Sequence, residues 1–176
     1  MKVQRITGII LKSTPIFEHD KQIELYSKTH GKCRFLAKRI HKKGAFVGRL
    51  EPLNHVSICS YKGKSFLYIN QCDVIDFFPK IREDFNRLSL ALFCVDIIRK
   101  STVYDQDNPA LFSILHIALT AINKELNLHS IKNKFQNNIL ISEGVKDPHT
   151  DDSSTNDFTN IFESYSGHKV IEPLFL

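Results

Sequence analysis

The stretch DVIDFFPKIRED, residues 73–84, marks the point at which the chain changes character. Before it, short segments alternate polar and apolar residues and are separated by turns that contain glycine. After it, apolar residues recur every three or four positions, which is the spacing of a helix with a buried face. Pro79 has no amide hydrogen and therefore suits the first turn of a helix. The stretch predicts an α+β chain in which strands give way to helices near Pro79.

The first part of the chain contains five segments with the residue pattern of β-strands. The last two of them flank Lys62-Gly63-Lys64, which predicts a hairpin turn. Five short strands with glycine-bearing turns are typical of a small barrel or sandwich, and they fit an OB-type barrel. We therefore expect a five-stranded OB-type β-barrel domain over residues 1–79. Its expected strands are residues 4–11, 22–26, 32–39, 55–61 and 65–75.

The second part predicts an α-helical domain over residues 80–176. Apolar residues cover much of the circumference of a long expected helix at 81–100, so this helix should be central to the helical core. Glu83 and Asp84 fall in its first turn, where they would complement the helix dipole. A second helix is expected from Asn108, its N-cap, and Pro109 to about residue 126, and a third at 131–142 that ends before Gly144. A polar linker follows at 146–157. The last expected element, at 158–176, is a C-terminal helix that is capped by Gly167 and followed by a tail.

Several classes of site have no counterpart in the sequence. The four cysteines are widely spaced and form no C-x-x-C pair, so we expect neither a structural zinc site nor a disulfide. No phosphate-binding glycine loop, nucleophile elbow or H-E-x-x-H helix occurs either. The sequence therefore predicts a protein without catalytic residues, bound metal or cofactor. No secretory signal or membrane-length apolar run is present, which predicts a cytoplasmic location.

Charge is divided unevenly along the chain. Residues 1–80 carry a net charge of +9, and residues 81–176 carry a net charge of −4. The densest basic stretch is residues 32–43. A basic block on one domain predicts binding to a polyanion, most often nucleic acid. An ordinary solvated basic face is the alternative.

The basic residues fall into three groups. Alternation in the strand at 32–39 places Lys32, Arg34, Leu36 and Lys38 on one face, which is mainly cationic, and Cys33, Phe35, Ala37 and Arg39 on the other, which is mostly apolar. The loop after this strand and the tip of the expected hairpin add further cations. Cations that follow phosphates are what nucleic-acid-binding grooves contain. The candidate DNA-binding residues are Lys32, Arg34, Lys38, Arg39, His41, Lys42, Lys43, Arg49, Lys62 and Lys64.

Aromatic residues border the same hairpin tip. Single-strand binders place such rings between their cations, where the rings stack on bases. Phe66, like Phe35, alternates with apolar neighbours, and this spacing predicts a core position. Tyr61 and Tyr68 fit either a stacking role or a packing role.

Three stretches carry a likeness to a known family over about residues 4–145. The first begins at Gly8-Ile9-Ile10-Leu11-Lys12 and continues to Ala37-Lys38, and the second is Leu50-Glu51-Pro52-Leu53 followed by Tyr61-Lys62-Gly63. The third and most specific is residues 73–84. Together with the last residues, 165–176, they resemble the bacterial recombination mediators of the RecO family.

The resemblance implies an N-terminal OB-fold and a C-terminal helical domain. It also implies a DNA repair protein that binds single- and double-stranded DNA and anneals complementary strands. Members of the family bind the acidic, apolar C-terminal tail of single-strand-binding protein (SSB), and with RecR they help to load RecA onto SSB-coated DNA. An association with the nucleoid follows. An SSB-tail site needs an apolar slot rimmed by cations, and the candidates in the helical domain are Arg87, Arg99, Lys100, Lys132 and Lys134.

One departure from the family pattern leaves alternatives open. Many members carry a four-cysteine, zinc-finger-like module where this chain has only residues 149–156, so we expect a shortened member that lacks the module. One alternative is a non-catalytic adaptor of SSB and RecR with little DNA binding of its own. Another is a general RNA-binding OB protein.

Overall fold

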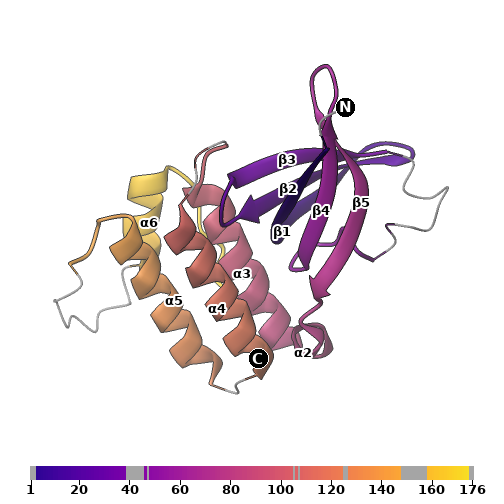
Figure 1. Ribbon diagram of the computed structural model, residues 1–176. Coiled ribbons are helices and arrows are strands. Elements are labelled where there is room, and N and C mark those ends of the chain that lie inside the picture. Colours follow the sequence, from indigo (N-terminus) through magenta and orange to yellow (C-terminus); the bar gives the residue numbers. More distant parts are fainter. Residues whose placement is uncertain are drawn as a thin grey trace. The chain divides into compact units, whose positions relative to one another are not determined.

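The computed structural model describes residues 3–38, 46, 48–104, 106, 108–124, 127–147 and 158–174. The chain divides into two compact units (Figure 1). The barrel unit comprises Met1–Phe77 and Thr102–Phe112, and the helical unit comprises Phe78–Ser101 and Ser113–Leu176. The segment after the first long helix therefore groups with the strands, although it lies far from them in sequence.

The strands of the barrel unit close into a barrel in the order β1-β2-β3-β5-β4 (Figure 1). Neighbouring strands are antiparallel except β3 and β5, which run parallel. This confirms the predicted five-stranded OB-type barrel. The strands are β1 (Val3–Phe17), β2 (Asp20–Ser27), β3 (Gly31–Ala37), β4 (His55–Lys62) and β5 (Leu67–Asp76).

Strand β1 is longer than its apolar run predicted, because it pairs with two partners in succession. Its first part pairs with β4 and its second part with β2, and the register shifts between Ile10 and Lys12. Such an irregularity bends a strand and lets it turn from one side of a barrel to the other. Gly8 lies where both pairings overlap, and a Cβ atom there would come within 2.4 Å of the Tyr26 carbonyl oxygen. Only glycine permits this close approach.

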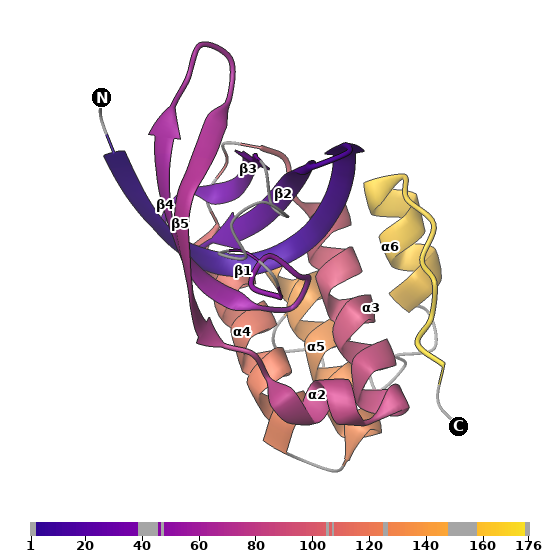
Figure 2. The ribbon, with the colours of Figure 1, turned by 90° about the vertical axis from the view of Figure 1, so that its right-hand side faces the viewer.

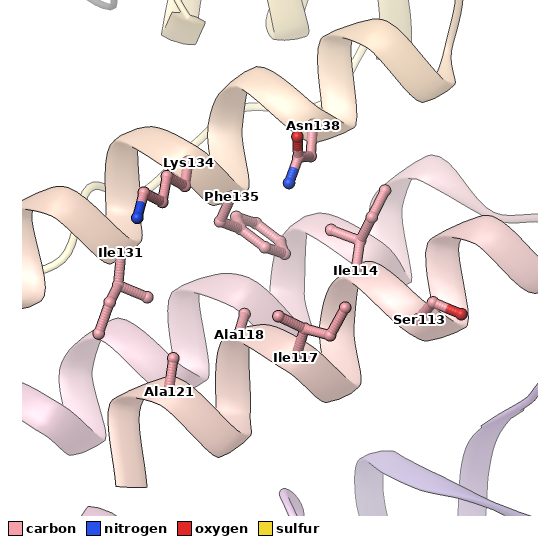
Figure 3. Close-up of a pocket in the computed structure, with 9 residues that line it drawn as sticks. All are labelled: Ser113, Ile114, Ile117, Ala118, Ala121, Ile131, Lys134, Phe135 and Asn138. Atoms are coloured by element: carbon pink, nitrogen blue, oxygen red, sulfur yellow. The ribbon is translucent and has the colours of Figure 1, made fainter. Parts of the chain in front are cut away.

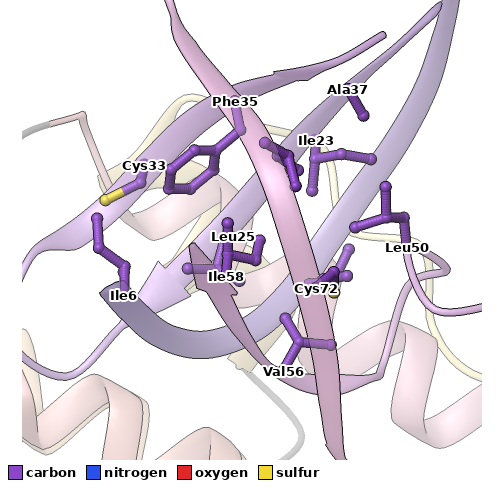
Figure 4. Packing of buried hydrophobic residues seen from close by; sticks show 12 residues of the cluster. Ile6, Ile23, Leu25, Cys33, Phe35, Ala37, Leu50, Val56, Ile58 and Cys72 are labelled. Atoms are coloured by element: carbon purple, nitrogen blue, oxygen red, sulfur yellow. The ribbon is translucent and has the colours of Figure 1, made fainter. Parts of the chain in front are cut away.

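The barrel is filled by alternate residues of every strand (Figure 4). On β3 the buried set is Cys33, Phe35 and Ala37, as the alternation predicted. These side chains meet aliphatic residues of the other strands, so the apolar face of β3 is fixed toward the barrel core and its other face is left for polar groups. The cluster comprises Ile6, Ile10, Ile23, Leu25, Cys33, Phe35, Ala37, Leu50, Val56, Ile58, Ile69 and Cys72.

The barrel closes through a short seam. Between β3 and β5 the paired residues are Phe35 with Leu67 and Leu36 with Tyr68. Farther along the same strand, Lys32 forms a parallel bridge with Tyr104. The segment Thr102–Phe112 is also held by the Tyr26 hydroxyl, which donates to the Asn108 carbonyl oxygen at 3.2 Å. This segment therefore extends the pairing of β3 beyond the five strands.

The described part of the helical unit contains one helix more than the sequence predicted, and Figure 2 shows the short α2 before α3. The expected helix at 81–100 is interrupted at Asp84, which is extended (φ −130°, ψ 127°). The Asp84 carboxylate accepts a hydrogen bond from the Arg87 amide at 2.8 Å, so it caps a new helix instead of lying in the first turn of a long one. The helices are α2 (Pro79–Glu83), α3 (Phe85–Ser101), α4 (Pro109–Lys124), α5 (Leu128–Ser142) and α6 (Phe158–Ser166).

The predicted helix ends are mostly confirmed. The Asn108 side chain accepts from the amides of Ala110 and Leu111, which makes it the N-cap of α4. Gly144 and Gly167 follow α5 and α6 with φ angles of 72° and 68°, the left-handed conformation of a helix C-terminus. Helix α5 begins at Leu128, earlier than predicted, because the side chain of Asn127 caps it. Most of the predicted polar linker, residues 148–157, lies outside the described residues.

Helix α3 is buried on much of its circumference, as its composition predicted. The ring of Phe93 meets the rings of Phe135 and Phe158 edge to face, each at a centroid distance of 6.3 Å. These contacts join α3 to α5 and α6 in the core of the helical unit. None of the helices described is long and apolar enough to cross a lipid bilayer.

Candidate nucleic-acid interface

Lys32 lies on the polar face of β3, yet its side chain is buried. Only 7% of the residue is exposed. Its ammonium group donates to the Thr102 carbonyl oxygen at 3.1 Å and lies 4.9 Å from the centre of the Tyr104 ring. The charge of Lys32 is thus bound within the barrel unit, where it holds the segment after α3 against β3.

Arg34 lies two residues farther along the same face and is exposed. Its Nε donates to the Tyr104 hydroxyl oxygen at 3.2 Å, and its guanidinium carbon lies 4.3 Å from the centre of the ring. The Tyr104 hydroxyl in turn donates to Oε1 of Glu24 at 2.9 Å. Burial raises the pKa of Tyr104 above its ordinary value, and the bond to Glu24 adds to this rise, although the Arg34 guanidinium opposes it. Tyr104 therefore keeps its proton at neutral pH and can hold both neighbours.

The cations of the hairpin meet Arg34 around one hollow in the barrel unit. We call it the barrel pocket; its volume is about 340 Å³. Lys62 and Lys64 are exposed, and neither forms an ion pair with a residue that the structure describes. Three of the predicted DNA-binding residues are therefore brought together. The pocket is lined by Cys33, Arg34, Lys62, Lys64, Ser65, Phe66, Leu67 and Tyr104.

Phe66 corrects a prediction. Its alternation with apolar residues predicted a core position, but it is 49% exposed and lines the barrel pocket. The reason is that β5 begins only at Leu67, so Phe66 belongs to the hairpin turn, where the strand alternation does not apply. The Gly63 amide donates to the Phe66 carbonyl at 2.8 Å and closes this turn. Phe35 is buried in the barrel, as predicted.

The two tyrosines of the hairpin lie against each other. The rings of Tyr61 and Tyr68 are stacked with a centroid distance of 5.4 Å, and the Lys38 ammonium lies 4.7 Å from the centre of the Tyr68 ring. Lys38 is exposed, so its charge stays accessible while its direction is set by the ring. Lys38, which follows β3, thus places a further cation next to an aromatic ring of the hairpin.

Arg49, another predicted DNA-binding residue, does not line the barrel pocket. Arg49 donates to the carbonyl oxygen of Cys72 at 3.0 Å. Burial raises the pKa of the Cys72 thiol to about 11, although the charge of Arg49 opposes this rise. The side chain of Arg49 therefore has a structural bond in the barrel. Arg39, His41, Lys42 and Lys43 lie outside the described residues.

Tyr104 and Glu24 belong to the site but were not found from the sequence. Tyr104 lies 70 residues after Arg34, in a stretch that reads as a connection between two helices. Glu24 lies in the expected strand at 22–26, where the alternation identifies the apolar core residues but assigns no role to a polar one. No local pattern links these residues, because the pairing of β3 with the distant segment is a tertiary contact.

The cations predicted for the helical domain differ in how they are engaged. Arg99 and Lys100 both form ion pairs with Asp96, at 2.8 Å for Arg99. Lys132 pairs with Glu172, and Arg87 donates to the Ile122 carbonyl oxygen. The side chain of Lys134 differs from these four, since it forms neither an ion pair nor a hydrogen bond with a described residue.

Lys134 lines an apolar hollow in the helical unit, which we call the helical pocket. Figure 3 shows side chains of α4 and α5 facing each other across it, with Lys134 and Asn138 on α5. Its volume is about 230 Å³. Ile117 lines it although 66% of the residue is exposed, so an apolar surface is open to a ligand there. The lining residues are Ser113, Ile114, Ile117, Ala118, Ala121, Ile131, Lys134, Phe135 and Asn138.

Neither pocket has the residues of a metal site. Within the described ranges, no group of three or more histidine, cysteine, aspartate or glutamate side chains could hold a metal ion. The four cysteines are free thiols.

Two family profiles match successive parts of the chain. The profile described as "Recombination protein O N terminal" matches residues 1–78, and the one described as "Recombination protein O C terminal" matches residues 82–140. The first coincides with the five strands and the second begins within α2 and ends within α5.

Curated proteins described as "DNA repair protein RecO" are similar to the same region. The protein from Alkaliphilus metalliredigens is 28% identical over 144 residues, which are 81% of this chain and 58% of the relative. The protein from Acetivibrio thermocellus is 30% identical over 125 residues, which are 70% of this chain and 50% of the relative. The protein from Thermoanaerobacter sp. is 27% identical over 125 residues, with the same shares. The chain thus spans about half the length of the curated relatives that it matches.

Proposed function

The chain belongs to the RecO family, and from this membership we propose that it is a non-catalytic mediator of DNA repair and recombination. It binds single- and double-stranded DNA, anneals complementary strands, and acts with RecR on SSB-coated DNA to promote RecA loading. The observation that carries the proposal is the barrel pocket, where Arg34, Lys62 and Lys64 gather next to exposed aromatic surface.

The proposed mechanism is electrostatic. Two complementary strands repel each other through their phosphates, and cations that lie between them lower this repulsion. Lys62 and Lys64 have no partner in the described chain, so their charges are available to phosphates. Because each phosphate contact releases counterions, binding should weaken steeply as the salt concentration rises.

The proposal includes an SSB contact in the helical unit. The family's SSB ligand is acidic and apolar, so it needs an apolar slot with a cation at its rim. The helical pocket has this composition, and among the five candidate cations Lys134 is the one that lines it. We therefore assign the SSB tail to the helical pocket, with Lys134 binding a carboxylate and Ile114 and Ile117 binding the apolar side chains.

The test is the annealing of complementary oligonucleotides coated with SSB. The wild-type protein should accelerate annealing, and the double variant Lys62→Glu, Lys64→Glu should lose the acceleration. The matched control is Lys80→Glu, Arg82→Glu, which changes the charge equally on exposed residues of α2. If the control loses as much activity as the hairpin variant, general charge drives annealing and the barrel pocket does not.

A second measurement separates the adaptor alternative. A fluorescent peptide with the sequence of the SSB tail should bind the protein. Lys134→Glu should weaken this binding at least tenfold, because the peptide carboxylate then faces a glutamate in place of a lysine. Lys132→Glu is the control, because Lys132 pairs with Glu172. Peptide binding without any annealing would favour an adaptor of SSB and RecR. A preference for RNA over DNA of equal length would favour an RNA-binding protein.

A further inference from the structure

The barrel pocket contains more than the positive charge that DNA binding requires. Arg34 and Phe66 both line it, and the hairpin lysines Lys62 and Lys64 line the same hollow. Its volume of about 340 Å³ lies within the range of about 300–1,000 Å³ that small-ligand sites occupy. Such a pocket can take one unit of a polymer, and its chemistry indicates which unit.

Arg34 is held in place before any ligand binds. Its Nε donates to the Tyr104 hydroxyl and its guanidinium carbon lies 4.3 Å from the centre of the Tyr104 ring, while the Tyr104 hydroxyl donates to the Glu24 carboxylate. Glu24 is only 9% exposed, so the carboxylate that accepts the hydrogen bond from Tyr104 is held within the barrel. The terminal nitrogens of Arg34 form no hydrogen bond to another described residue. A guanidinium that is already oriented and has free terminal nitrogens is a two-pronged donor for phosphate oxygens.

Phe66 supplies a different kind of surface. About half of the residue is exposed in the hairpin turn, next to Lys62 and Lys64, whose charges are unpaired within the described chain. An exposed aromatic ring beside cations is the arrangement on which a nucleic-acid base stacks while its phosphate is neutralised. A base within a duplex has its two faces covered by its neighbours and cannot use this ring.

We propose that the barrel pocket is a single-nucleotide site, in which the base of one unstacked nucleotide lies on Phe66 and its phosphate lies on Arg34. Tyr104 and Glu24 are positioning residues, since they act through Arg34. The inference rests on the proposed DNA binding and deepens it, because it explains how the protein holds a single strand with its bases exposed for pairing. It also assigns a role in the DNA site to the segment after α3, which lies outside the five strands.

The test compares two eight-nucleotide ligands of equal charge on the full chain. One is abasic throughout, and the other carries a single 2-aminopurine in the middle. The added base should tighten binding by about 5- to 100-fold, which is the gain from stacking one base on one ring. The fluorescence of 2-aminopurine should be quenched in the complex. Phe66→Leu should remove both the gain and the quenching, whereas the control Phe77→Leu, at another exposed phenylalanine of the barrel unit, should leave both unchanged.

Variants of the Arg34 series test the phosphate contact. Arg34→Lys keeps the charge but loses the two parallel hydrogen bonds that a guanidinium can donate to a phosphate. Affinity for both ligands should therefore fall about tenfold, while the salt dependence of binding stays the same. Tyr104→Phe keeps the ring beside Arg34 and loses the two hydroxyl bonds, so it should weaken binding about threefold without changing the salt dependence. Arg5→Lys is the control for Arg34→Lys; Arg5 is paired with Asp73 and does not line the pocket.

The outcomes separate the inference from the proposed function. If ordinary single-stranded DNA and the abasic ligand bind but the added base gives no gain, the pocket holds no base, and the inference fails while the proposed DNA binding stands. A full gain in Phe66→Leu also overturns the inference. If the wild-type protein binds none of these ligands, both the inference and the proposed function fail.

Discussion

At the scale of single residues, the same residue type takes opposite roles according to its surroundings. Lys32 and Lys62 both belong to residues 1–80, the part of the chain with a net positive charge. Lys32 is buried and its ammonium group is bound to the Thr102 carbonyl oxygen, whereas Lys62 is exposed and has no ion-pair partner in the described chain. A buried charge that loses its hydrogen bonds is costly, while an exposed one is free to bind a phosphate. Lys32 should therefore matter for stability and Lys62 for DNA binding.

This difference predicts opposite phenotypes for alanine variants. Lys62→Ala, Lys64→Ala should lower the slope of log affinity against log salt by about 1.4 for single-stranded DNA, or about 0.7 for each phosphate that is no longer neutralised. The midpoint of urea unfolding should not change. Lys32→Ala should leave the slope unchanged and lower the free energy of unfolding by about 1–3 kcal/mol, because the hydrogen bond from the ammonium group to the Thr102 carbonyl oxygen is lost. A reduced slope in a fully folded Lys32→Ala protein would contradict this assignment.

At the scale of elements, polar and charged side chains near both ends of helix α3 determine where it begins and stabilise its last turns. Asp84 is too extended to continue α2 and instead caps α3 through the Arg87 amide. Near the other end, Asp96 accepts from Lys100 and Arg99 in the last two turns. Burial alone would raise the pKa of Asp96, but the bonds from Lys100 and Arg99 outweigh burial and hold it below the ordinary value. The charged form of Asp96 is therefore the form that stabilises the helix.

The lowered pKa of Asp96 predicts a pH-dependent contribution to stability. A carboxylate with a lower pKa in the folded state stabilises the protein above its unfolded pKa of about 3.9, and the contribution disappears as the pH falls through the folded value. Asp96→Asn should therefore lower the free energy of unfolding at pH 7 by about 1 kcal/mol. The difference from wild type should shrink below about pH 4. Urea unfolding of both proteins between pH 3 and pH 7 would measure it, and a difference that is constant over this range would be the contrary result.

At the scale of the whole molecule, the two compact units are interleaved in sequence. The barrel unit takes its strands from the first 77 residues and adds Thr102–Phe112, which follows α3. That segment supplies partners to Lys32, Glu24 and Tyr26. The predicted division into domains at 1–79 and 80–176 stays a proposal. The grouping of this segment with the strands means that the barrel is completed by residues from beyond that boundary.

A chain cut after residue 77 should therefore form a weaker barrel. It retains all five strands but lacks three part-buried hydrogen bonds, namely Lys32 to the Thr102 carbonyl, Tyr104 to Glu24 and Tyr26 to the Asn108 carbonyl. Each of these bonds contributes about 0.5–3 kcal/mol. Its β3 amides should exchange hydrogen faster than those of the full chain, and its urea midpoint should be lower. Val103→Ala in the full chain is the control, since Val103 is 61% exposed in the same segment. Equal protection of β3 in the cut chain and the full chain would be evidence against a structural role for the segment.

The sequence by itself determined the parts of this protein that depend on local patterns. Alternation placed Cys33, Phe35 and Ala37 in the barrel core, and capping chemistry placed the start of α4 at Asn108 and the end of α6 at Gly167. The motif at residues 73–84 led to the RecO family, to which the profile matches assign the chain. These features were predictable because helix caps and strand faces are set by residues close together in the chain.

Only the tertiary structure decided which polar residues meet. Tyr104 joins Arg34 across 70 residues, and Lys32, a candidate DNA-binding residue, is buried and donates to the Thr102 carbonyl oxygen. Phe66 lies outside the core because the strand starts two residues later than predicted. The interruption of the long helix at Asp84 was missed because a capping carboxylate and a first-turn carboxylate look the same in sequence. Contacts between distant segments depend on the closed barrel, and no local periodicity records them.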